Sequence, residues 1–293
     1  MTSSPNVSPF LRGPPHWWQW ATILSLDAPA VAVLWQWMLA RTMHVTLGWP
    51  HAFIVGTSVW LAYAADRWIE GWWLKPERVR TQRHFFYQRW RWPLAVGWSA
   101  MLVADVTVSL RYLTSREFKA GLLLLLPVFA YLLSHQLIHR LRRWRAPKEI
   151  CVALLFSGGV SVFLVAELSP VLRALPLPLL LFALLCFANC ALISVWEQAV
   201  DQAHGQTSLA LQFDRTRTMA RVLPWIIALA AIAFAAGHTG PARATGVCAA
   251  LSGGLLGVLD LAIGRKNPRL ARALVDFALM TPAIVLIFER WFF

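Results

Sequence analysis

Nine apolar segments, each about 20 residues long, constrain the fold of this chain more than any other feature. They cover residues 17–40, 49–67, 93–111, 117–136, 149–168, 176–198, 220–237, 242–263 and 270–289. A helix of about 20 apolar residues crosses the hydrocarbon core of a bilayer. The alternating pattern of a β-barrel is absent, and a spanning segment must satisfy its own backbone hydrogen bonds. We therefore predict an all-α, polytopic membrane protein with nine transmembrane helices.

The composition argues against an ordinary water-soluble enzyme. Only 14% of the residues are charged and the mean hydropathy is +0.55, whereas a typical soluble domain has about 25% charged residues. The polar residues 1–16 precede an apolar run that has no small-residue cleavage site, so we expect an uncleaved first span. All four cysteines lie in apolar runs, which supports neither a disulfide framework nor a zinc site.

Membrane topology, rather than nucleic-acid binding, accounts for most of the net charge of +13. If the N-terminus lies inside, 20 of the 27 Lys and Arg residues fall on the inside and seven on the opposite side. Such a bias marks the cytoplasmic side of a membrane protein. We expect an integral protein of the bacterial inner (plasma) membrane that contacts lipid and binds no nucleic acid. The loops after the second and sixth spans would then face the cytoplasm.

Two pairs of carboxylates stand at matching places in the chain. Asp66 and Glu70 end the second predicted span, and Glu197 and Asp201 end the sixth. In each pair the spacing of four residues places both side chains on one face of a helix. The offset from Asp66 to Glu197 equals that from Glu70 to Asp201, at 131 residues. Both pairs lie at the inside ends of their spans.

This offset indicates an internal repeat. It contains four predicted spans, an even number, so the two helices that carry the pairs point the same way. We predict one transmembrane domain over residues 1–293, with parallel half-repeats at about 17–136 and 149–263 and a ninth helix at about 270–289. Two such helices meeting at one interface would bring the four carboxylates together.

A cation is needed between four converging carboxylates, because like charges repel one another. Mg²⁺ prefers hard oxygen ligands and often binds a few carboxylates together with substrate phosphates. We therefore predict that the four carboxylates are metal ligands. Arg80 and Arg83 follow the first pair, and arginine suits phosphate oxygens. The alternative is that each pair only reaches the membrane interface and binds nothing.

A second basic region runs from His139 to Lys148. It is either an interfacial segment attracted to anionic lipid or a second wall for a diphosphate. Ionisable residues in three other spans, Asp27, Asp260 and Asp276, have two interpretations as well. They extend a polar cavity, or they pair with the arginines near the last two spans and hold the bundle together.

The two acidic motifs resemble those of the UbiA superfamily of intramembrane prenyltransferases, whose members have nine transmembrane helices. Residues 66–70, Asp-Arg-Trp-Ile-Glu, are similar to the second half of the family's first motif, N-D-x-x-D-x-x-x-D. Residues 197–201, Glu-Gln-Ala-Val-Asp, are similar to its second motif, and Gly205 to Leu209 resemble the glycine-containing segment that follows. Residues 80–83 resemble the arginine-containing segment after the first motif.

The resemblance implies a UbiA-like bundle and a reaction. The four carboxylates, Asp66, Glu70, Glu197 and Asp201, would be the catalytic residues. Mg²⁺ held by them would neutralise an isoprenyl diphosphate, and the isoprenyl group would pass to a small aromatic or lipid-like acceptor. Arg80 and Arg83 would hold the diphosphate oxygens. Further substrate-binding candidates are Arg67, Asn189 and Ser208. Asn189 lies two turns before the second motif on a similar face, and an interhelical hydrogen bond is its alternative role.

The first motif departs from the family pattern. Ala62 and Tyr63 occupy the positions of its Asn and first Asp, and Glu replaces Asp at positions 70 and 197. Tyr63 either replaces a lost metal ligand or donates a hydrogen bond to a diphosphate oxygen, so it is also a substrate-binding candidate. These departures leave a second function open, that of a non-catalytic UbiA-like membrane protein acting as a lipid- or partner-binding scaffold.

Overall fold

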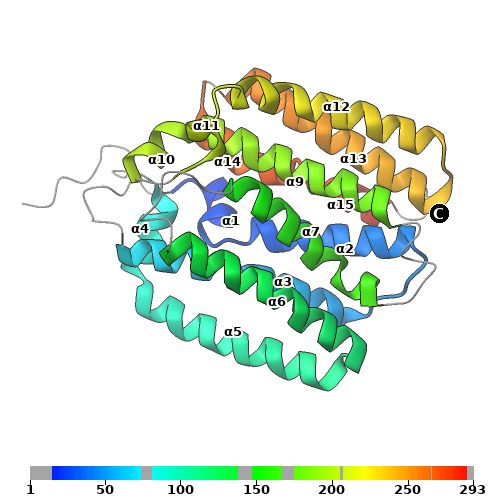
Figure 1. Ribbon diagram of the computed structural model, residues 1–293, viewed down its shortest axis with the longest axis horizontal. Helices are drawn as coiled ribbons and strands as arrows, with labels where there is room; N and C mark the ends of the chain where they lie inside the picture. The colour runs from blue at the N-terminus through cyan, green and yellow to red at the C-terminus, as the bar shows by residue number, and fades with distance from the viewer. Residues whose placement is uncertain are drawn as a thin grey trace, which may run out of the picture.

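The computed structural model describes residues 15–73, 81–137, 147–166, 175–204, 207–264 and 266–288. Every regular element in these ranges is a helix, which confirms the all-α prediction. The long helices lie side by side and nearly parallel along the longest dimension of the molecule (Figure 1). In chain order the elements are η2 (Trp17–Gln19), α1 (Trp20–Ile23), α2 (Asp27–Thr42), α3 (Trp49–Trp73), α4 (Gln82–Arg89), α5 (Arg91–Tyr112), α6 (Ser115–Leu137), α7 (Lys148–Ala166), α9 (Pro176–Trp196), α10 (Gln198–His204), α11 (Leu209–Gln212), α12 (Thr216–Ala236), α13 (Gly240–Leu259), the π-helix η5 (Asp260–Gly264), α14 (Pro268–Phe277) and α15 (Pro282–Ile287).

Proline and glycine placement explains where several helices begin and how closely they pack. Proline occupies the first turn of α9, α13, α14 and α15, where its missing N–H costs no hydrogen bond. A Cβ added at Gly253 of α13 would lie 2.8 Å from the carbonyl oxygen of Pro224 in α12, and one at Gly246 would lie 2.8 Å from Ala235 Cβ. Glycine therefore allows the close contact of α12 with α13, as small residues commonly do between membrane helices.

Each of the nine predicted segments contains helix, but nine spans are not confirmed. Five described helices are long and apolar enough to cross a membrane, namely α5, α7, α9, α12 and α13 continued by η5. A sixth span requires counting the helices over 17–23 and 27–42 as one, although they are bent by 75°. The prediction of one uninterrupted helix over 17–40 is wrong, because Ser25 adopts a left-handed φ of 59°. The predicted ninth helix is likewise divided into α14 and α15.

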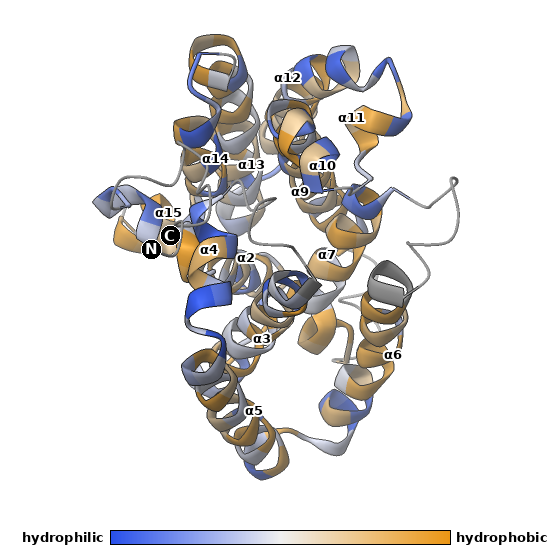
Figure 2. Ribbon diagram, turned by 90° about the vertical axis from the view of Figure 1, so that its left-hand side faces the viewer, coloured by the Kyte–Doolittle hydropathy of each residue, from blue (hydrophilic) through white to orange (hydrophobic). Residues whose placement is uncertain are grey.

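The outer helices show that this is an integral membrane protein. Only 11% of the apolar window of α5 is buried inside the protein. Large aliphatic side chains such as Val96, Leu110 and Leu123 are about two-thirds exposed or more, at 71%, 67% and 67%. The hydrophobic colouring of α5 and α6 makes the same point (Figure 2). An apolar surface this extensive is stable in lipid and not in water.

The core lies between α2 and α9. Trp35 of α2 is completely buried and stacks on Phe182 of α9 with ring centroids 4.7 Å apart. The Trp35 indole N–H donates to the carbonyl oxygen of Leu279, at a distance of 2.7 Å. This contact satisfies the single polar atom of a large buried ring. It also ties the first half of the chain to the break between α14 and α15.

Candidate functional site

Both acidic motifs lie at the same end of the bundle. Asp66 and Glu70 occupy the last two turns of α3. Glu197 follows the last residue of α9, and Asp201 lies in α10. The Asp201 N–H donates to the carbonyl oxygen of Glu197 at 2.9 Å, which keeps the second pair one turn apart across the helix break. The short helices α4 and α10 lie together at this end, and their hydrophilic stretches stand out in the end-on view (Figures 1 and 2).

The short helix α4 joins the two motifs through adjacent residues. Arg83 donates from Nη2 to Glu197 Oε2 at 2.9 Å, and His84 Nε2 lies 2.8 Å from Glu70 Oε2. Thr81 caps the start of α4, where its hydroxyl accepts a hydrogen bond from the His84 N–H and lies 2.5 Å from His84 Nδ1. The N-terminal cap therefore fixes the orientation of the imidazole that reaches the first motif.

A lysine lies near carboxylates of both motifs. Lys148 is the first residue of α7, and its Nζ is 3.8 Å from Asp201 Oδ1, an ionic contact longer than a hydrogen bond. The same ammonium group interacts electrostatically with Glu70 and Asp66. Cations from α4 and α7 therefore lie among the four carboxylates and reduce the repulsion between them.

The described residues contain no preformed metal site. No group of three or more His, Cys, Asp or Glu side chains in these ranges is arranged to hold a metal ion. Carboxylates are nevertheless the hard oxygen donors that Mg²⁺ prefers. The donor set thus fits Mg²⁺ by its chemistry, while its oxygens face protein cations. The assignment of the four carboxylates as metal ligands stays a prediction.

Burial and charge shift three pKa values at the second motif. Burial opposes the ionisation of Glu197, yet the neighbouring Arg83 guanidinium holds the pKa of this carboxyl below its ordinary value. Burial raises the pKa of Asp201, even though Lys148 acts in the opposite direction. Burial, together with the nearby His84, lowers the pKa of His204 to about 4. The two imidazoles meet edge to face with centroids 5.1 Å apart, and His204 is neutral near pH 7.

Arg67 and Tyr63 have distinct surroundings beside the first motif. The Arg67 guanidinium is buried and donates to the Thr22 carbonyl oxygen at 2.8 Å and to Ser25 Oγ at 2.5 Å. It lies 5.8 Å from the centroid of the Tyr63 ring. Tyr63 is half-buried, and its hydroxyl has no hydrogen-bond partner among the described residues. Arg67 thus holds α3 to the α1–α2 break, whereas the Tyr63 hydroxyl remains available to a ligand.

Of the other predicted substrate-binding residues, the structure describes the contacts of Asn189 and Ser208. Asn189 donates from Nδ2 to Asp276 Oδ1 at 2.9 Å, which is the interhelical hydrogen bond of its alternative role. Ser208 is buried, and its hydroxyl lies close enough to affect the ionisation of Asp201. Arg80 lies outside the described residues, as does Gly205.

Two of the acidic residues in the later spans hold the bundle together. Asp276 accepts a hydrogen bond from Asn189 of α9 at 2.9 Å and another from Arg272, four residues earlier in its own helix, at 2.5 Å. Asp260 accepts from the Trp196 indole N–H at 3.0 Å and lies 3.5 Å from Arg221 Nε. These pairs support the structural interpretation of both carboxylates. Asp27 is buried and interacts with Asp276 and Arg272, so it belongs to the same inner cluster.

Sequence reasoning missed three contributors to this end of the bundle. The basic run from His139 to Lys148 does not single out Lys148, although this residue directly precedes an apolar span at the motif end and contacts Asp201. Tyr131 of α6 interacts electrostatically with Asp66, and no local pattern marks it. His84 directly follows Arg83 in the sequence, but its pairing with Glu70 follows from the fold and not from a local pattern.

The comparisons with known proteins support the fold. No known protein family matches the sequence, and neither does any curated protein. The structure is similar to the apo structure of a UbiA homolog from Aeropyrum pernix K1, with a TM-score of 0.59 and 15% sequence identity. The match covers 89% of this chain and 98% of that one. The chain therefore has a UbiA-like fold, in agreement with the prediction from its two acidic motifs.

Proposed function

We propose that this protein transfers an isoprenyl group from an isoprenyl diphosphate to a small aromatic or lipid-like acceptor within the membrane, in a reaction that depends on Mg²⁺. The observation that supports this most is the contact of α4 with both acidic motifs, through Arg83 and His84. Charges of both signs are interleaved at one end of an apolar bundle. A metal–diphosphate complex, which also carries both signs of charge, complements such a cluster.

Mg²⁺ would be held by the four motif carboxylates, and when bound it would neutralise the diphosphate and help it to leave. Its binding requires the carboxylates to exchange protein cations for the metal. Arg83 and Lys148 would then be released from Glu197 and Asp201. Both cations are already at the site, so they would be available to the phosphate oxygens.

The remaining roles follow from side-chain chemistry. The planar fork of Arg83 suits two phosphate oxygens, and Lys148 supplies a compact charge. The Tyr63 hydroxyl would donate a third hydrogen bond from α3. The apolar interior would exclude water from the isoprenyl group as positive charge develops on it.

Thermal unfolding of the purified protein tests this proposal. A ligand at 100 times its dissociation constant stabilises a protein by about 2.7 kcal/mol. Farnesyl diphosphate should therefore raise the melting temperature when Mg²⁺ is present and leave it unchanged when EDTA replaces the metal. Farnesol, which lacks the diphosphate, is the matched control ligand. An equal shift with farnesol and Mg²⁺, or no shift with isoprenyl diphosphates of any length, would remove the support for an enzyme.

A second candidate function is that of a lipid- or partner-binding scaffold without catalysis. Protein cations already neutralise carboxylates of both motifs, and the described residues form no group of three metal-binding side chains. A scaffold needs the ion pairs only for stability. In this case Mg²⁺ would have no effect on the melting temperature, while loss of Arg83 would still lower it.

We further propose that the motif end faces the cytoplasm across the bacterial inner membrane. The excess of Lys and Arg on this side supports the orientation. In a cysteine-free background, Gln82→Cys in α4 should resist a membrane-impermeant thiol reagent in intact cells and react after lysis. Thr46→Cys, which is exposed between α2 and α3 at the opposite end, should react in intact cells. The reverse labelling pattern would overturn the orientation.

A further inference from the structure

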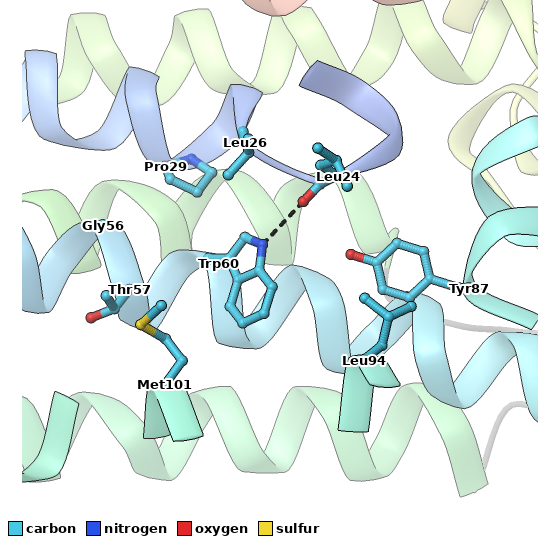
Figure 3. A pocket seen from close by; sticks show the side chains of 9 residues that line it. All are labelled: Leu24, Leu26, Pro29, Gly56, Thr57, Trp60, Tyr87, Leu94 and Met101. Carbon is cyan, nitrogen blue, oxygen red and sulfur yellow. Dashed lines mark hydrogen bonds between the residues drawn. The ribbon is translucent and has the colours of Figure 1, made fainter. Parts of the chain in front are cut away.

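An apolar groove lies on the flank of the bundle, and none of the four motif carboxylates lines it. Its volume is about 360 Å³, which is within the range of small-ligand sites. Its walls come from the α1–α2 break, from Gly56 and Trp60 of α3, and from Leu94 and Met101 of α5, while Tyr87 of α4 closes one end (Figure 3). A Cβ added at Gly56 would lie 3.2 Å from Val33 Cγ2, so glycine at this position lets α2 and α3 pack closely beside the groove.

The depth of the groove in the membrane determines what can fill it. Gly56 and Trp60 are near the middle of α3, and Met101 is at the middle of α5. Leu26 at its edge is 50% exposed, and Val103 on the adjoining surface of α5 is 66% exposed. The groove is therefore continuous with the lipid-facing surface. Hydrocarbon chains are the surroundings at this depth, so they are the molecules available to occupy it.

Polar groups inside the groove are satisfied by the protein. The Trp60 indole N–H donates to the Leu24 carbonyl oxygen at 3.0 Å, and the Tyr87 hydroxyl points into the groove (Figure 3). The Tyr87 hydroxyl is 2.9 Å from Ser25 Oγ, which accepts the hydrogen bond from Arg67. An apolar chain can therefore lie along the walls without leaving a buried donor unpaired.

Positive charge flanks the end of the groove nearer the acidic motifs. Arg89 and Arg91 are exposed at the junction of α4 and α5, between the groove residues Tyr87 and Leu94. In the part of the chain that the structure describes, neither arginine has an acidic partner. Arg91 shares a face of α5 with Leu94 and Met101, because these positions recur at helical spacing. Its guanidinium lies 4.7 Å from the Trp72 ring centroid, as expected of an interfacial residue.

We propose that this groove binds one anionic phospholipid of the leaflet on the motif side. One acyl chain lies between α3 and α5, and the phosphate contacts Arg91 and Arg89. Hydrocarbon matches the walls, and an anionic phosphate matches the two arginines. The site is separate from the proposed diphosphate site, and its existence does not depend on the transferase proposal. The hydrogen bonds from Tyr87 through Ser25 to Arg67 connect it to the first motif.

Native mass spectrometry of the full-length protein in detergent, titrated with phosphatidylglycerol or phosphatidylcholine, tests the proposal. Met101→Trp fills the groove and should remove one bound phosphatidylglycerol. Val103→Trp adds the same ring to the lipid-facing side of the same helix and should remove none. Arg91→Gln should weaken phosphatidylglycerol binding about fivefold and phosphatidylcholine binding less, because the choline cation already offsets the charge of that phosphate. Arg111→Gln makes the same charge change at the other end of α5. It should leave the preference of the protein for phosphatidylglycerol over phosphatidylcholine unchanged.

Photocrosslinking of the unmodified protein gives an answer even if Met101→Trp unfolds. Phosphatidylglycerol with a diazirine in its acyl chain should label peptides that contain Trp60 and Met101. The proposal is overturned if the labels fall only on the outer faces of α6 and α12. It is overturned equally if both tryptophan variants keep the same number of lipids, or if wild-type protein binds the two lipids with equal affinity.

Discussion

The two acidic motifs have the same spacing but different surroundings. The first lies on one continuous helix, where Glu70 lies 2.8 Å from the His84 imidazole. The second straddles the break between α9 and α10, where Glu197 is paired with Arg83, which is always charged. Equal spacing in sequence therefore does not produce equal electrostatics. The second motif contains a permanent ion pair, whereas Glu70 of the first motif contacts an imidazole.

Breaking the permanent pair should have the largest effect. Arg83→Gln leaves the Glu197 carboxylate without its guanidinium, and both side chains are largely buried, with exposures of 16% and 13%. We expect a loss of about 3 kcal/mol in the free energy of unfolding. His84→Gln should cost less than about 1 kcal/mol, because a glutamine amide still donates to Glu70. Chemical denaturation in detergent measures both.

The matched control for this comparison is Arg89→Gln, which removes the same charge from an exposed position of the same helix. Its effect on stability should be within about 0.5 kcal/mol. If His84→Gln destabilises the protein as much as Arg83→Gln does, the contrast between the two motifs is wrong.

The next largest effect concerns Tyr63, where the first motif departs from the UbiA pattern. Its hydroxyl has no partner among the described residues, so we expect it to donate to a diphosphate oxygen. Tyr63→Phe should then weaken Mg²⁺-dependent diphosphate binding by about 1–3 kcal/mol. Tyr112→Phe, at the exposed end of α5, is the control. An unchanged affinity for Tyr63→Phe, combined with stronger Mg²⁺ dependence for Tyr63→Asp, would identify position 63 as a lost metal ligand instead.

The smallest effect is a pH dependence at the contact of the two histidines. The pKa of His204 is about 4 in the folded protein and about 6.5 when unfolded. The unfolded chain therefore binds the proton first, and stability falls as the pH decreases from about 6.5 to 4. Partial exposure reduces the effect to about 1 kcal/mol. His204→Gln should lose this part of the pH slope in denaturation curves, whereas His44→Gln, at the opposite end, should retain it.

Much of the fold followed from the sequence because hydrophobicity and charge act locally. Apolar runs predicted helices in each segment, and the acidic pairs were predicted correctly to lie at one end. The bend at Ser25 was not predictable, since a left-handed φ is unusual for serine. The division of the ninth segment near Leu279 does have a sign in the sequence, because Pro282 lies inside the segment and proline favours the first turn of a new helix.

The site was harder to predict because its partners are distant in sequence. Arg83 and Glu197 are 114 residues apart, and nothing near either residue identifies the other. Lys148 and Tyr131 reach the carboxylates only after α6 and α7 have packed. Residue types therefore suggested the chemistry of the site, while the pairing of its charges depends on tertiary packing.

A double-mutant cycle tests most directly the claim that the two motifs form one site. Asp66→Asn, Asp201→Asn and the double variant would be titrated with farnesyl diphosphate in the presence and absence of Mg²⁺ by calorimetry. If one cluster holds the metal and diphosphate, each single change should reduce Mg²⁺-dependent affinity at least about tenfold, and the double variant should lose little more. Losses that multiply to about 100-fold in the double variant would mean that the motifs act independently, and the account of a shared site would be contradicted.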